Sequence, residues 1–206
     1  MAWPSSPEEL VETQSALAAA RVEAWARREA PAVGGCFVCF ERGLAGPGRP
    51  GDRGWAGAAV LRAGRMLATS SVEGTAGAAY RPGLLALREG PLLEAAVRAL
   101  DSRPDVLLVN ATGRDHPRGA GLALHLGAVL EVPTVGVTDR PLVDDRAARW
   151  VTTRPGARPL LVHPGWRTDL DTAVEVVLDA TRRARTPEPL RRAREVARRA
   201  RAQASR

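Results

Sequence analysis

The fold is decided by two stretches of sequence, PDVLLVNATGRDHPRGAGLALHLGAVL at residues 104–130 and VPTVGV at residues 132–137. Residues 106–109 form a short, continuous apolar run, which is typical of a strand covered on both faces. Residues 117–130 predict a helix, and residues 133–137 predict the next strand. The centre of the chain is therefore a strand–helix–strand unit.

The flanking sequence adds antiparallel strands before this unit and helices around it. Residues 55–61 and 66–72 predict two strands joined by a tight turn. The other predicted elements are strands at residues 34–40 and 160–163, helices at residues 6–29, 84–100 and 169–183, and a further helix in the tail. This order indicates an α/β fold with a mixed sheet of five to six strands and helices on both faces.

Length and composition favour one domain over residues 1–206. Within it, we expect an N-terminal helical segment at residues 1–31 and an arginine-rich C-terminal helix at residues 182–206. No apolar run approaches the roughly 18–20 residues that a membrane-spanning helix needs. The start of the chain, MAWPSSPEEL, also lacks the order of a secretion signal. We therefore expect a cytoplasmic protein without a membrane partner.

Positive charge is concentrated in the tail. Residues 182–206 carry ten arginines and two glutamates, a net charge of +8, whereas the whole chain has a formal charge of +7. A concentrated basic segment raises affinity for polyanions such as DNA and RNA. The alternative is a solvated helix, because Leu190, Ala193, Ala197 and Ala200 recur at helical spacing and leave the arginines facing water. Both interpretations stay open at this point.

Two blocks carry a resemblance to a known family. They are YRPGLLALREGP at residues 80–91 and HPRGAGLA at residues 116–123. Together with the stretches quoted first, they resemble endonuclease V, a family that cuts DNA or RNA near deaminated adenine. The likeness runs from about residue 33 to residue 194 and includes TPEPLR at residues 186–191. The resemblance implies a ribonuclease-H-like fold and a nucleic-acid partner that can contain inosine.

The resemblance also implies four positions that hold Mg²⁺ for hydrolysis. In this sequence those positions carry Phe37, Glu89, Asn110 and Trp166, so Glu89 alone keeps a metal-binding carboxylate. A lysine of the family falls on Asp139. We expect the rings of Phe37 and Trp166 to fill the cavity, and Mg²⁺ to be a cofactor only if activity remains.

By the same resemblance, nucleic-acid-binding residues are retained. Residues 80–83 would form a wedge that enters the strand beside the damaged base, and others would surround a pocket for the flipped base. These residues are Tyr80, Pro82, Gly83, Gly113, His116, Arg118 and Gly121. An exposed tyrosine beside a rigid Pro-Gly can stack on unpaired bases. His116 has an alternative interpretation as a structural histidine bonded to the backbone.

Three hypotheses follow. The first is a nucleic-acid-binding relative of endonuclease V with lost or impaired hydrolysis. The second is an active, rearranged Mg²⁺-dependent nuclease that uses Glu89 with Asp115, Asp139 or His163. The third is a non-catalytic scaffold for protein contacts. An open acidic cleft beside Glu89 would favour the second hypothesis, and a cleft filled by apolar rings would oppose it.

Overall fold

The computed structural model describes residues 1–143 and 147–205. Within these ranges the chain forms five helices and seven strands. In chain order they are α1 (Pro7–Ala19), β1 (Val33–Phe40), β2 (Arg53–Arg62), β3 (Arg65–Thr75), α2 (Leu85–Arg98), β4 (Val106–Val109), α3 (Leu122–Leu130), β5 (Thr134–Thr138), β6 (Arg149–Val151), β7 (Leu160–Pro164), α4 (Leu170–Asp179) and α5 (Glu188–Ala204). In this part of the chain, no helix has both the length and the apolar character to cross a membrane.

The strands form one sheet in the order β3-β2-β1-β4-β5-β7-β6. β1, β2 and β3 are antiparallel neighbours, β1-β4 and β4-β5 are parallel, and β7 is antiparallel to both β5 and β6. The predicted mixed α/β sheet is thus confirmed, with one strand more than expected. The additional strand, β6, has three residues of which only Val151 is buried, so it lacks the alternation that identifies a strand in sequence.

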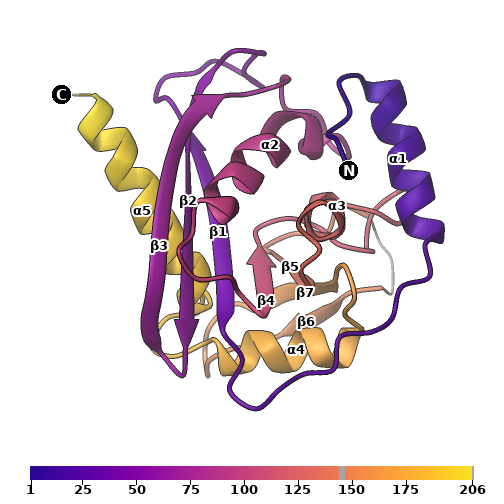
Figure 1. Cartoon of the computed structure of the whole chain (residues 1–206), viewed down its shortest axis with the longest axis vertical. Coiled ribbons are helices and arrows are strands. Elements are labelled where there is room, and N and C mark those ends of the chain that lie inside the picture. The colour runs from indigo at the N-terminus through magenta and orange to yellow at the C-terminus, as the bar shows by residue number, and fades with distance from the viewer. Residues whose placement is uncertain (144–146, 206) are drawn as a thin grey trace.

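Helices cover both faces of the sheet (Figure 1). On one face, α2 and α3 pack over Cys36, Val38, Leu107 and Val109, with Leu10 of α1 joining the same core. On the other face, α4 packs over Val106, Leu108, Val135 and Val162. α5 crosses that same face over β1 and β2, where Ala193 and Ala197 are buried.

The N-terminal helix is shorter than the sequence predicts. α1 begins after Ser6, whose hydroxyl accepts a hydrogen bond from the Glu9 amide at 3.2 Å, as expected of an N-cap. It ends at Ala19, and residues 20–29 are not helical. Tertiary contacts explain the difference, because the Trp25 amide donates to the Arg167 carbonyl at 2.7 Å and the Trp25 side chain packs against the α4 core.

Two other boundaries also differ. α3 begins at Leu122 rather than residue 117, because Gly119 adopts a positive φ of 68° that interrupts a helix. α5 begins at Glu188, after Pro187, so residues 182–187 do not belong to it.

α5 lies unusually close to the sheet. A Cβ at Gly35 would come within 2.4 Å of the Pro189 backbone, and a Cβ at Gly57 would come within 2.6 Å of the Ala193 carbonyl. Real Cβ atoms are not found that close to backbone atoms, so glycine is required at both positions. The arginine-rich helix is consequently part of the core on its inner side and is not a detached tail.

Candidate nucleic-acid interface

The first cavity of interest lies beside Glu89, in the first half of α2. It has a volume of about 300 Å³. Its lining includes Glu89, Asn110 at the end of β4, residues 36–38 of β1, Tyr80, Leu85 and Leu93. The structure thus brings together three of the four positions that the resemblance assigned to the metal site, Phe37, Glu89 and Asn110. The cavity is open, but among the described residues that line it, Glu89 carries the only carboxylate.

Apolar walls change the acidity of this carboxylate. Glu89 is partly buried, and desolvation raises its pKa to about 7, with the positive charge of Arg88 acting in the opposite direction. Arg88 offsets the desolvation of the Glu89 carboxylate only in part, because the Arg88 guanidinium forms its hydrogen bonds with other groups. That group donates to Asp52 Oδ2 at 3.0 Å and to the Ala78 carbonyl at 2.6 Å, and it lies over the ring of Phe40.

The donor set does not fit a magnesium site. Mg²⁺ prefers several oxygen ligands in octahedral geometry, with one or two carboxylates at about 2.1 Å. Here the cavity offers one carboxylate, which burial keeps partly protonated near pH 7, and the neutral amide of Asn110. Across residues 1–143 and 147–205, no group of three or more His, Cys, Asp or Glu side chains is placed to hold a metal ion.

Phe37 contributes both to the cavity beside Glu89 and to the layer between the sheet and α5. Besides lining the cavity, its side chain packs with Ala59, Leu61 and Ala193 in the layer between the sheet and α5. The guanidinium of Arg194 lies over its ring, with Cζ 5.0 Å from the ring centroid. Phe37 therefore contributes to docking of α5 and leaves the cavity beside Glu89 open.

Trp166 lies away from the cavity beside Glu89. It packs against Leu17 of α1 and against Ala120 and Leu124 near α3, and it does not line the cavity beside Glu89. The expectation that Phe37 and Trp166 together fill the site is wrong. The reason is that Trp166 satisfies its apolar surface in the layer between α1 and α3.

The three residues considered as replacement ligands do not gather around Glu89. Asp115 and His163 are fully buried next to each other, with His163 Nδ1 3.2 Å from Asp115 Oδ2. Asp139 is exposed and forms an ion pair of 2.6 Å with Arg185. None of the three lines the cavity beside Glu89.

A second cavity, also of about 300 Å³, lies next to the first and is lined by the predicted wedge. Tyr80, Pro82, Gly83 and His116 contribute to its wall, together with Asn110 and residues 140–142. Tyr80 is 48% exposed. Because Tyr80 and Asn110 line both cavities, the wedge and the Glu89 carboxylate belong to one continuous surface at the end of β4, beside residues 36–38 of β1.

The wedge is anchored through one carbonyl. The Gly83 carbonyl oxygen accepts three hydrogen bonds, from Arg118 Nη2 at 2.7 Å, Gln14 Nε2 at 3.1 Å and His116 Nε2 at 3.2 Å. Arg118 Nε also donates to Gln14 Oε1 at 2.6 Å, which ties two of the donors together. Gly83 has a positive φ of 76°, a conformation that favours glycine. Gln14 is buried on α1 and could not be identified from the sequence, because it belongs to no motif.

His116 is held as a neutral, structural histidine. The Arg118 amide donates to Nδ1 at 3.2 Å, so the proton is on Nε2, which donates to the Gly83 carbonyl. Burial and the nearby charge of Arg118 lower the pKa of His116 to about 4. The interpretation of His116 as a histidine bonded to the backbone is thus confirmed, and the same ring also lines the wedge cavity.

Gly113 and Gly121 allow close approach of backbone segments. A Cβ at Gly113 would come within 2.1 Å of the Pro164 carbonyl oxygen, and a Cβ at Gly121 would come within 2.3 Å of the Thr112 carbonyl oxygen. The Gly121 amide donates to the Gly113 carbonyl at 2.7 Å. Neither glycine lines the wedge cavity, so their role at a base stays a prediction, whereas their packing role is direct.

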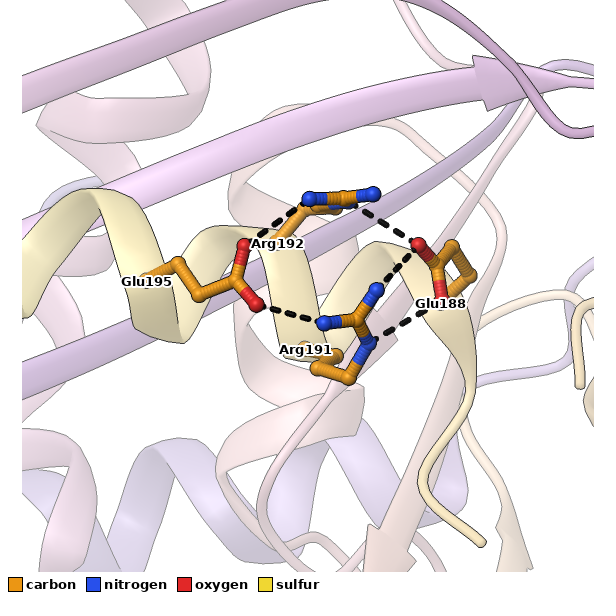
Figure 2. A network of polar contacts seen from close by, with 4 residues as sticks. All are labelled: Glu188, Arg191, Arg192 and Glu195. Atoms are coloured by element: carbon orange, nitrogen blue, oxygen red, sulfur yellow. Dashed lines mark hydrogen bonds and ion pairs between the residues drawn. The ribbon is translucent and has the colours of Figure 1, made fainter. Parts of the chain in front are cut away.

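The arginines of α5 divide into two groups. In the first half of the helix, Arg191 and Arg192 both bind Glu188 and Glu195 (Figure 2). These four charges cancel, so this half presents little net charge. In the second half, no described acid pairs with the exposed arginines at positions 198 and 199. Among the described residues of α5, these two exposed arginines are the best placed to offer cationic side chains to a polyanion.

Solved structures of known proteins define the class to which this architecture belongs. Endonuclease V from Streptomyces avermitilis superimposes with a TM-score of 0.87 at 31% sequence identity, covering 99% of this chain and 96% of that one. The fold is therefore the ribonuclease-H-like α/β fold that the resemblance implied. The sequence model of the endonuclease V family matches residues 26–150 and 140–195. The chain belongs to the endonuclease V family.

Two further relatives show how far the similarity extends along the chain and in the fold. Endonuclease V from Methanopyrus kandleri is 42% identical over 139 residues, which cover 58% of this chain and 60% of that protein. The match thus spans less than two thirds of that relative. Endonuclease V from Ciona intestinalis, solved in complex with a 24-mer DNA containing an inosine followed by a ribo-adenosine, has the same fold, with a TM-score of 0.79 at 20% identity over 96% of this chain and 98% of that chain.

Proposed function

We propose that this protein binds inosine-containing DNA or RNA with its wedge and has lost most or all of the metal-dependent hydrolysis of its family. One observation carries the proposal: an anchored, exposed wedge lies at the same strand ends as a cavity in which Glu89 is the only carboxylate of the described residues. An exposed surface suited to binding therefore lies beside a cavity to which the described residues bring no second carboxylate for a divalent ion.

The wedge supports binding by stacking. Tyr80 presents an exposed aromatic ring, and the bonds to the Gly83 carbonyl hold its loop in place. Aromatic rings stack on unpaired bases of any sequence, which contributes about 1–3 kcal/mol per base. A relative of this fold from Ciona intestinalis was solved with inosine-containing DNA, which supports the choice of ligand.

The loss of hydrolysis follows from the chemistry of the donors. A catalytic metal neutralises charge that develops on the phosphate and lowers the pKa of the attacking water. Glu89 with a pKa of about 7 and a neutral amide are weak ligands for such an ion. An open cavity beside Glu89 is the observation that keeps an active, rearranged nuclease as the second candidate.

The experiment compares binding and cleavage of the same labelled single strands, with and without a central inosine, as DNA and as RNA. We expect salt-sensitive binding and no inosine-dependent cleavage with Mg²⁺ or Mn²⁺ at high protein concentration. Tyr80→Ala should weaken binding by about 5- to 100-fold, because one stacked base is lost. Tyr80→Phe keeps the ring and should bind within about twofold of the unaltered protein.

Two results would contradict the proposal in different ways. Cleavage that disappears in Glu89→Ala would establish the second candidate, an active nuclease. An absence of binding even at low salt would favour the third hypothesis, a scaffold for protein contacts. Circular dichroism of each variant shows that the fold is kept.

A further inference from the structure

A third surface cavity lies beside the wedge cavity. Its volume is about 520 Å³. Its lining consists of Asp139, Arg140, Trp150, Arg158, Pro159 and Arg185. Three arginines, one acid and one tryptophan therefore face the same cavity.

Trp150 is the most unusual member of this set. It lies on the edge strand β6 and is 50% exposed, although an indole ring is normally largely buried in a protein of this size. Its neighbour Arg149 is bound to Asp171 at 2.9 Å, so β6 is held to α4 while the ring of Trp150 faces solvent. An exposed ring on a fixed strand is suited to stacking on a flat partner.

The charges around Trp150 favour an anionic partner. Arg185 is committed, because it binds Asp139 and donates to the carbonyl oxygens of Arg158 and Pro159 at 2.6 and 2.8 Å. Within residues 1–143 and 147–205, neither Arg140 nor Arg158 has an acidic partner for its guanidinium, and both are exposed. With Asp139 already neutralised by Arg185, the cavity keeps two cations that no acid of the described residues pairs with, beside an aromatic ring.

The position of the cavity points to the same ligand as the wedge. Arg140 lines both the wedge cavity and this third cavity, so the two are neighbours on one surface. A strand that places one base on Tyr80 can continue past Arg140 and bring a later base to Trp150. Guanidinium groups along a path with aromatic rings at intervals are the features that bind single-stranded nucleic acid without regard to sequence.

We propose that Trp150, Arg140 and Arg158 form a second contact site for single-stranded nucleic acid, in which Trp150 stacks on an unpaired base and the two arginines bind the flanking phosphates. This inference rests on the proposed function, because it extends the same strand beyond the wedge. It assigns to the protein a longer footprint than the wedge alone provides.

The test measures fluorescence anisotropy of labelled single strands of about 12 nucleotides, as DNA and as RNA, between about 50 and 200 mM NaCl. Trp150→Ala should weaken binding by about 5- to 100-fold, and Trp150→Phe should restore most of the affinity. Arg158→Ala should reduce the slope of log affinity against log salt by about 0.7, the value for one phosphate contact on a single strand.

Matched controls come from the opposite edge of the sheet. Leu67 and Arg65 are exposed on β3, far along the strand order from β6. Leu67→Ala removes an exposed apolar side chain and Arg65→Ala removes an exposed guanidinium, and both should leave affinity and salt slope unchanged. Quenching of tryptophan fluorescence on binding should fall in Trp150→Phe, which separates stacking from a change in fold.

The outcomes distinguish this site from the wedge. If Tyr80→Ala weakens binding and Trp150→Ala does not, the second contact site is refuted and the proposed function stands. If neither DNA nor RNA binds at low salt, the proposed function fails and this inference fails with it. Loss of affinity for RNA alone in Trp150→Ala would support the site and identify RNA as its ligand.

Discussion

Lowering the pH from about 6.5 to about 4.5 is expected to reduce the free energy of unfolding by about 2–3 kcal/mol. The main cause is two buried neutral histidines, His116 and His125, whose pKa values are each lowered to about 4. Their ordinary pKa is about 6.5, so between these values the unfolded chain binds protons that the folded chain does not. Stability must therefore fall as the pH falls through this window.

Glu89 acts in the opposite direction. Its pKa is raised from 4.5 to about 7, so the folded chain holds a proton that the unfolded chain releases between these values. This offsets about one histidine, since each unit of pKa shift corresponds to about 1.4 kcal/mol. Burial also lowers the pKa of the third histidine, His163, but the adjacent Asp115 carboxylate opposes this shift, so these two groups titrate as a pair.

Urea denaturation at several pH values, followed by circular dichroism, tests this expectation. Glu89→Gln removes the opposing group, so the loss between about pH 6.5 and 4.5 should grow to about 4 kcal/mol. His125→Leu should make the free energy of unfolding nearly independent of pH in this window. It should also raise the free energy of unfolding at pH 7 by about 1–3 kcal/mol. The gain arises because both ring nitrogens of His125 are buried without a hydrogen-bond partner in the described part of the chain, beside Trp3. Equal pH profiles for all three proteins would refute this account.

Deleting residues 187–206 is expected to abolish the folded state. α5 buries Leu190, Ala193 and Ala197 against the sheet, and its removal would expose Trp55 and Leu61 of β2. Burial of each large apolar side chain contributes about 1.5–3 kcal/mol, and a domain is stable by only about 5–15 kcal/mol. The deletion therefore removes about as much free energy as the protein has. Expression of an unfolded or aggregated chain, seen by circular dichroism, is the expected outcome.

Deletion of residues 203–206 is the matched control and should leave the melting temperature unchanged, since residues 203–205 are exposed.

Gly57→Ala tests the contact between α5 and the sheet by adding a single carbon, because its Cβ would lie 2.6 Å from the Ala193 carbonyl oxygen. It should cost about 1–3 kcal/mol, the usual effect of overpacking. A folded protein without α5 would show that the helix is dispensable. Because the deletion of residues 187–206 is expected to unfold the protein, nucleic-acid binding by α5 is tested with Arg198→Ala and Arg199→Ala.

The central strands could be predicted because their residues are buried on both faces, as at Val106–Val109, and this is visible as an apolar run. The end of α1 and the presence of β6 could not. In both cases contacts with distant residues decide the structure, such as the bond from Trp25 to Arg167. Local propensity contains no information about such partners.

The candidate site shows the same division. The motifs identified Tyr80, Gly83, His116 and Arg118, and the structure joins three of them at the Gly83 carbonyl. Gln14 could not be found, because it comes from a helix 69 residues away and belongs to no motif. The location of Trp166 was also beyond prediction, since a substitution in sequence does not reveal which neighbours the new ring will contact.

The three hydrogen bonds at the Gly83 carbonyl have a consequence for how the protein meets its ligand. A loop that must become ordered on binding loses conformational entropy at that moment, which weakens the complex. Here the turn is already fixed to α1 through Gln14 and to the segment before α3 through His116 and Arg118. Under the proposed function, the wedge therefore enters a strand in its final shape, and the flexible nucleic acid is the partner that deforms on binding.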